Sequence, residues 1–149
     1  MPPVQLFFLC SALLILPLAW VKGGHPERAG VALFIGAYVS GPFLQGYQVG
    51  DVMVAVALCD LVVWSVFVGL ALRYDRWWLL LASGAQSLNV LSHAAILLTP
   101  DLSTREAVAA QWVFGLVSLY ALFSGILERH LSGERAASPA LFRTPAPQT

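Results

Sequence analysis

Long apolar stretches, separated by short polar or charged segments, run through most of the 149-residue chain. An α-helix needs about 20 apolar residues to cross the roughly 30 Å of hydrocarbon in a bilayer. Four stretches reach this length, at about 4–21, 51–72, 77–98 and 104–130. The pattern therefore predicts an all-α fold, a polytopic helical bundle in a membrane.

A fifth stretch, 29–48, is apolar enough to span, but Gly36 and the pair Gly41-Pro42 interrupt it. The distribution of Lys and Arg separates two topologies, because cytoplasmic loops collect basic residues. If 29–48 spans, seven of the eight basic residues share one side; if it does not, the split is five to three. We therefore expect five transmembrane helices, with the N-terminus outside and the C-terminus cytoplasmic. Four helices plus a broken or re-entrant segment is the alternative.

The bundle is expected to occupy residues 1–131, and residues 132–149 to form a flexible cytoplasmic tail. From Ser132 onward the chain has no hydrophobic period and mixes Ala, Ser and Pro with scattered charge. The first apolar stretch lacks a basic n-region and an A-x-A-like site, so we interpret it as a retained helix rather than a signal peptide. Ser103 and Glu106, which follow Pro100, have capping-box spacing and predict the start of the last helix.

Composition excludes several classes of protein. Hydrophobic residues make up 58% of the chain and charged residues 11%, against about 45–50% and about 25% in soluble domains. The net charge is zero and no basic cluster is present to bind nucleic acid. The two cysteines, Cys10 and Cys59, lie in apolar segments, so we expect neither a disulfide scaffold nor a redox role. The Ala/Leu/Val/Gly-rich composition with a single Lys favours a multi-pass protein of a bacterial inner membrane.

One carboxylate lies near the middle of a predicted span. Asp60 falls about ten residues from the outer end of its helix, where insertion scales assign an ionised carboxylate a cost of about 2.5–3.5 kcal/mol. On the next helix, Gln86, Asn89 and His93 share one face because they are three and four residues apart. Depth matching places Asn89 level with Asp60 and His93 about a turn nearer the outside.

Two further side chains reach a similar depth. The candidates for binding a proton, an ion or a small polar ligand are therefore Asp60, Asn89, His93, Gln86, Tyr38 and Gln111. An imidazole hydrogen-bonded to a carboxylate binds and releases protons near neutral pH. The alternative is that these residues only hold helices together, since a polar contact between membrane helices contributes about 0.6–2 kcal/mol.

No metal or cofactor is predicted. The other histidines, His25 and His130, both fall at the cytoplasmic side, too far from His93 for two of them to ligate one haem within a chain. The chain also lacks GxSxG, HExxH and glycine-rich phosphate-loop motifs, so we do not expect an enzyme.

Small residues on the last helix predict close helix packing, with Gly115, Ser118 and Gly125 near one stripe. The charges near the cytoplasmic turns are interpreted as a surface patch of low energetic value, each pair contributing less than about 1 kcal/mol. That patch comprises Glu27, Arg28, Arg73, Asp75 and Arg76. Trp77 and Trp78 are expected in the aromatic belt at the same interface.

The function expected from these observations is that of an accessory or structural subunit. Short loops and missing motifs favour a protein that packs against a larger membrane complex or assembles with itself in the lipid bilayer. The alternative is a small oligomeric transporter, or a proton- or ion-conducting module, that uses the Asp60, Asn89 and His93 cluster.

Overall fold

The computed structural model describes residues 3–47, 53–98 and 104–134, and the regular structure in these ranges is α-helical. This confirms the all-α prediction. The five helices are α1 (Pro3–Lys22), α2 (His25–Leu44), α3 (Val54–Arg73), α4 (Trp77–Leu98) and α5 (Thr104–Leu131).

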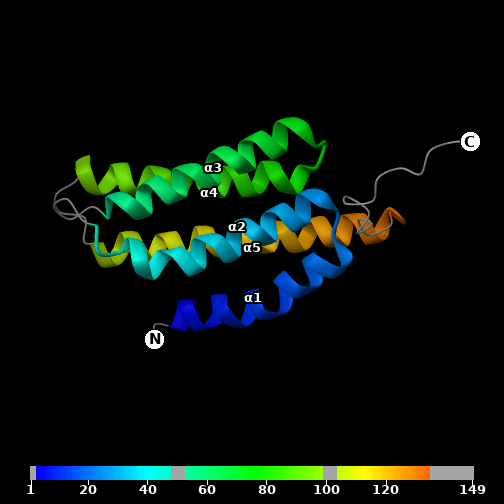
Figure 1. Cartoon of the computed structure of the whole chain (residues 1–149), viewed down its shortest axis with the longest axis horizontal. Coiled ribbons are helices and arrows are strands. Elements are labelled where there is room, and N and C mark those ends of the chain that lie inside the picture. Colours follow the sequence, from blue (N-terminus) through cyan, green and yellow to red (C-terminus); the bar gives the residue numbers. More distant parts are fainter. Residues whose placement is uncertain (1–2, 48–52, 99–103, 135–149) are drawn as a thin grey trace, which may run out of the picture.

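The helices lie side by side along the long axis of the bundle (Figure 1). Helix α4 packs between α3 and α5, α1 packs on α5 and α2, and α2 also contacts α3 and α5. The α1–α2 turn, the α3–α4 turn and the C-terminus of α5 meet at one end. We call it the basic end, because it carries Lys22, Arg28, Arg73, Arg76 and Arg129.

Four of the five helices are long and apolar enough to cross a membrane: α1, α3, and the greater parts of α4 and α5. Helix α2 has the same 20-residue length as α1, but it is less apolar and carries His25, Glu27 and Arg28 in its first turn. It continues without a break through Gly36 and Gly41 and ends at Leu44. The sequence-based idea of a break at Gly41-Pro42 is therefore wrong, because Pro42 falls in the last turn of a continuous helix.

Helix α2 begins and ends four residues earlier than the predicted 29–48. Pro26 stands in its first turn, where a missing backbone N–H costs nothing. The Glu27 carboxylate reaches back to accept a hydrogen bond from the Gly24 backbone N–H at 2.6 Å. Because of these two features, the helix begins before the apolar stretch. The predicted cap residue Ser103 and residues 135–149 of the predicted tail lie outside the described residues.

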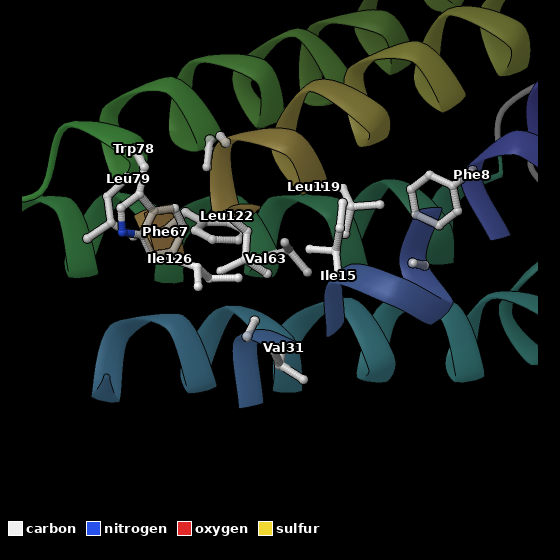
Figure 2. Packing of buried hydrophobic residues seen from close by; sticks show 14 residues of the cluster. Phe8, Ile15, Val31, Val63, Phe67, Trp78, Leu79, Leu119, Leu122 and Ile126 are labelled. Atoms are coloured by element: carbon white, nitrogen blue, oxygen red, sulfur yellow. The ribbon is translucent and has the colours of Figure 1, made fainter. Parts of the chain in front are cut away.

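Large buried apolar side chains gather in the half of the bundle nearer the basic end. Figure 2 shows Phe67, Trp78, Leu122 and Ile126 packed together there. Trp78 and Leu122 are fully buried, and the Phe67 ring meets the Trp78 ring edge-on with 6.4 Å between centroids. This half of the interior is therefore a dense apolar core contributed by α3, α4 and α5.

The small residues of α5 are covered by other helices of the same chain. A Cβ on Gly125 would come within 2.4 Å of Trp78 Cδ1, so α5 and α4 approach closely there. A Cβ on Gly115 would lie 3.4 Å from Phe8 Cε2 of α1. Ser118 is buried, and its hydroxyl donates to the Phe114 carbonyl of its own helix at 3.1 Å. The stripe therefore serves packing within the bundle.

Candidate functional site

Asp60 of α3 and His93 of α4 meet inside the bundle. Asp60 Oδ2 lies 2.9 Å from His93 Nε2, and the two side chains are 17% and 8% exposed. Asp60 lies 13 residues before Arg73, which places it about 20 Å from the basic end at the α-helical rise. A carboxylate and an imidazole at this distance share a hydrogen bond and can exchange a proton.

The partner of Asp60 is His93 rather than Asn89, which depth matching placed at the same level. Side chains in an α-helix tilt toward its N-terminus. Because α3 and α4 run in opposite directions, the Asp60 side chain leans away from the basic end and the His93 side chain leans toward it. The two tilts together bring Asp60 opposite His93.

Helix α5 contributes Gln111 to the same place. Gln111 Nε2 donates to Ser92 Oγ at 2.9 Å and lies 3.3 Å from His93 Nε2. Ser92 in turn donates to the backbone carbonyl of Asn89 at 2.7 Å. The imidazole is thus surrounded by polar groups from three helices, α3, α4 and α5.

Asn89 and Gln86 form a second buried pair on α4. Asn89 Nδ2 donates to Gln86 Oε1 at 2.8 Å, and both residues are buried. Two polar atoms of this face have no hydrogen-bond partner among the described residues, namely Asn89 Oδ1 and His93 Nδ1. Buried polar atoms in proteins are nearly always satisfied by protein or by ordered water, so these two mark a place where a further group belongs.

Tyr38 lies apart from this polar cluster. Its side chain is 46% exposed and lines an apolar groove between α1 and α2, together with residues such as Phe8 and Phe34. Depth matching placed Tyr38 at the right level, but depth does not specify the face of a helix. Ser40, on the same helix, donates to the Ala37 carbonyl and lies 3.7 Å from Cys59 of α3.

A second polar site, which the sequence reasoning missed, lies at the basic end. Glu27 is completely buried; its Oε2 accepts the Gly24 N–H, and its Oε1 accepts the Trp78 indole N–H at 3.0 Å. Arg129 Nε of α5 lies 3.5 Å from Glu27 Oε2. We call Glu27, Trp78 and Arg129 the Glu27 clasp; it joins α2, α4 and α5.

The Glu27 clasp corrects two sequence-based interpretations. Glu27 was expected in a surface patch and Trp78 in the interfacial belt, yet neither has exposed surface. Trp77, one residue earlier, is 51% exposed. The sequence carries a signal for the Gly24–Glu27 contact alone, because Gly24, Pro26 and Glu27 have the residue types and spacing of a helix start whose acid reaches back to the backbone.

An ion-pair network continues from the Glu27 clasp to the surface. Arg129 Nη1 lies 3.2 Å from Glu134, and Arg76 contacts both Glu134 and, at 3.6 Å, Glu128. The hydrogen bond from Arg76 lowers the pKa of Glu134, and the same bond raises the pKa of Arg76. The α3–α4 turn is thereby tied to the end of α5.

Within the described ranges, no group of three or more His, Cys, Asp or Glu side chains is placed to hold a metal ion. Cys10 is exposed and Cys59 is half-buried, and both are free thiols. Comparison with protein-family models, with curated proteins and with solved structures finds no match to this chain.

Proposed function

We propose that this chain is an accessory or structural subunit of a membrane assembly, with five transmembrane helices, in a bacterial inner membrane. The N-terminus lies outside, and the basic end faces the cytoplasm. Five basic residues at one end of the described chain support this orientation, because positive charge is retained on the cytoplasmic side. Helix α2 is the fifth proposed transmembrane helix, because it is as long as α1 and runs beside α5.

The observation that carries the accessory function is the apolar half of the bundle. Between the buried Gln86–Asn89 pair and the Glu27 clasp, the buried positions are occupied mainly by large apolar side chains such as Phe67, Leu119 and Leu122. The buried hydroxyl of Ser118 is engaged with its own helix. A single chain therefore offers no continuous polar route from one membrane face to the other through its described interior, as transport would require.

The short connections at the basic end support the same proposal. Two residues join α1 to α2 and three join α3 to α4. No soluble catalytic or recognition domain fits into such turns. The large exposed apolar surface, including Leu58, Leu61 and Val62 of α3, is available to lipid and to the helices of partner subunits.

Native mass spectrometry of the protein, extracted from its own membranes in mild detergent, tests this proposal. We expect a defined stoichiometric complex, either with other membrane proteins or with further copies of this chain. A strictly monomeric protein, extracted under conditions that keep a known membrane complex intact, would contradict it.

The second candidate function is an oligomeric transporter or a proton- or ion-conducting module, favoured by the Asp60–His93 contact at 2.9 Å. Purified protein in liposomes with an imposed pH gradient separates the two functions. The accessory function predicts equal, background-level dissipation for the wild type and Asp60→Asn. Dissipation by the wild type that Asp60→Asn abolishes, at equal protein incorporation, would instead establish the transport function.

The five-span topology is tested by the accessibility of single cysteines placed at His25, the first residue of α2, and at Tyr47, just beyond its end, in a background lacking Cys10 and Cys59. We expect an impermeant thiol reagent added outside to label position 47 and not position 25. Labelling of both positions from the same side would show that α2 does not cross.

A further inference from the structure

Two unpaired polar atoms lie on one face of α4, about one helical turn apart. His93 Nδ1 and Asn89 Oδ1 are buried and have no partner among the described residues. Residues four apart on a helix have Cβ atoms about 5–6 Å from one another. Two atoms at this spacing on one helix face can share a single small bridging group.

The protonation state of the Asp60–His93 pair determines whether His93 Nδ1 donates or accepts a hydrogen bond. A net charge in the interior of a membrane bundle is costly, so the neutral form of the Asp60–His93 pair is the stable one. That form holds one proton between Asp60 Oδ2 and His93 Nε2 and a second proton on Nδ1. This is true whether the first proton lies on the carboxyl or on the ring, so Nδ1 is a hydrogen-bond donor in both cases.

Asn89 offers the complementary atom. Its Nδ2 is engaged with Gln86 Oε1, which leaves Oδ1 as an acceptor. A group that fits between Nδ1–H and Oδ1 must accept one hydrogen bond and donate another. Water does both, and the buried waters of proteins typically occupy positions with two to four such polar partners.

We propose that a water molecule bridges His93 Nδ1 and Asn89 Oδ1 and makes this cluster a proton-exchange site. The proton on Nδ1 passes to the water, which is a hydronium only while it stays beside the pair, so the site as a whole remains neutral. Meanwhile the pair is an Asp60 carboxylate that accepts the Nε2–H of a neutral ring. Rebinding of a proton at Nδ1 reverses the step.

The proposed water lies on the basic-end side of His93, because Asn89 is one turn closer to the N-terminus of α4. The groups that face the imidazole are Asp60 from α3, Asn89 and Ser92 from its own helix, and Gln111 from α5. Toward the basic end the buried Asn89–Gln86 pair comes first, and the interior beyond it is apolar. Proton exchange at this site goes beyond a packing role and does not depend on it.

Solid-state NMR of protein labelled with ¹⁵N-histidine in lipid bilayers tests the proposal, because the chain has only three histidines. His25→Asn and His130→Asn assign the His93 ring. We expect His93 Nδ1 to carry a proton at neutral pH and to show magnetisation transfer from water. Asn89→Leu should abolish that transfer, whereas Ser83→Ala, a control on the same helix, should preserve it.

Each alternative result contradicts either the protonation of His93 Nδ1 or the bridging water. An unprotonated Nδ1 in the wild type would refute the charge-balance reasoning. A protonated Nδ1 without water transfer, or with transfer from lipid, would refute the bridging water. Both readings come from protein in which Asn89 is intact, so they stand even if Asn89→Leu fails to fold.

Discussion

The close approach of α5 to the Trp78 ring at Gly125 predicts a large effect from a single methyl group. Gly125→Ala places a Cβ within 2.4 Å of Trp78 Cδ1 and 2.6 Å of Trp78 Nε1. Carbon atoms in contact are normally about 3.5–4.0 Å apart, so the ring or helix α5 must shift by about 1 Å. Trp78 has no exposed surface and so no open space into which to move.

The expected cost has two parts. Overpacking a close-packed interior destabilises a protein by about 1–3 kcal/mol. A displaced ring also withdraws its N–H from Glu27 Oε1, now 3.0 Å away, and a hydrogen bond to a charged group contributes about 1.5–3 kcal/mol. We therefore expect Gly125→Ala to lower the free energy of unfolding by about 3 kcal/mol.

Gly84→Ala is the matched control. Gly84 lies within α4, and a Cβ there would meet no atom within 4 Å. Alanine is favoured over glycine inside a helix by about 0.5–1 kcal/mol, so this substitution should be neutral or stabilising. Reversible unfolding in mixed micelles, followed by circular dichroism and Trp fluorescence, measures both variants under the same conditions.

A double-mutant cycle with Trp78→Ala isolates the contact. If the clash with the indole causes the loss, Gly125→Ala should cost little once the indole has been removed, which gives a coupling energy close to the single-mutant loss. The reasoning is refuted if Gly125→Ala is as stable as Gly84→Ala, or if its cost persists unchanged in the Trp78→Ala background.

Three further predictions concern the ionisable groups. Glu27→Ala should cost about 3–5 kcal/mol because it leaves two buried N–H groups without an acceptor and removes the buried carboxylate beside Arg129, which retains Glu134; Glu134→Gln, at an exposed site, should cost much less by the same unfolding assay. Asp60→Leu combined with His93→Leu should be more stable than His93→Leu alone, since apolar pairs often replace buried ionic pairs without loss; equal stabilities would contradict this. Because the pKa of Glu134 is lowered in the folded chain, the contact with Arg76 stabilises the protein above the unfolded-state pKa, and this contribution is lost as the pH falls through the lower folded value; a stability-versus-pH curve that Glu134→Gln leaves unchanged would show that the contact has no energetic role.

Much of the fold follows from the length of the apolar runs. Helix α4 begins and ends where the hydrophobic pattern placed it, at 77 and 98, because its run is bounded by charge on one side and by Pro100 on the other. Helix α2 was misplaced because its start depends on Pro26 and on the reach of Glu27, which no hydrophobicity pattern contains.

The polar cluster around Asp60 and His93 could be predicted in part from the sequence. Depth along antiparallel helices follows from residue count, so Asp60 and the face containing Asn89 and His93 could be matched in level. Residue count does not specify on which face of its helix a side chain lies. For Tyr38 that face depends on how α2 packs against α1. Burial of Glu27 depends on two distant helices, and nothing local distinguishes it from an exposed acid.

The Glu27 clasp also has a consequence for biogenesis. Glu27 of α2 is synthesised 102 residues before its partner Arg129 of α5. At about 5–20 residues per second, an interval of roughly 5–20 s separates the two. During that time α2, which lacks the long apolar window of the other four described helices, is without its ionic partner. The contact that joins α2 to α5 therefore forms only after α5 has been synthesised, and a chain truncated before Arg129 has no Arg129 guanidinium to pair with Glu27.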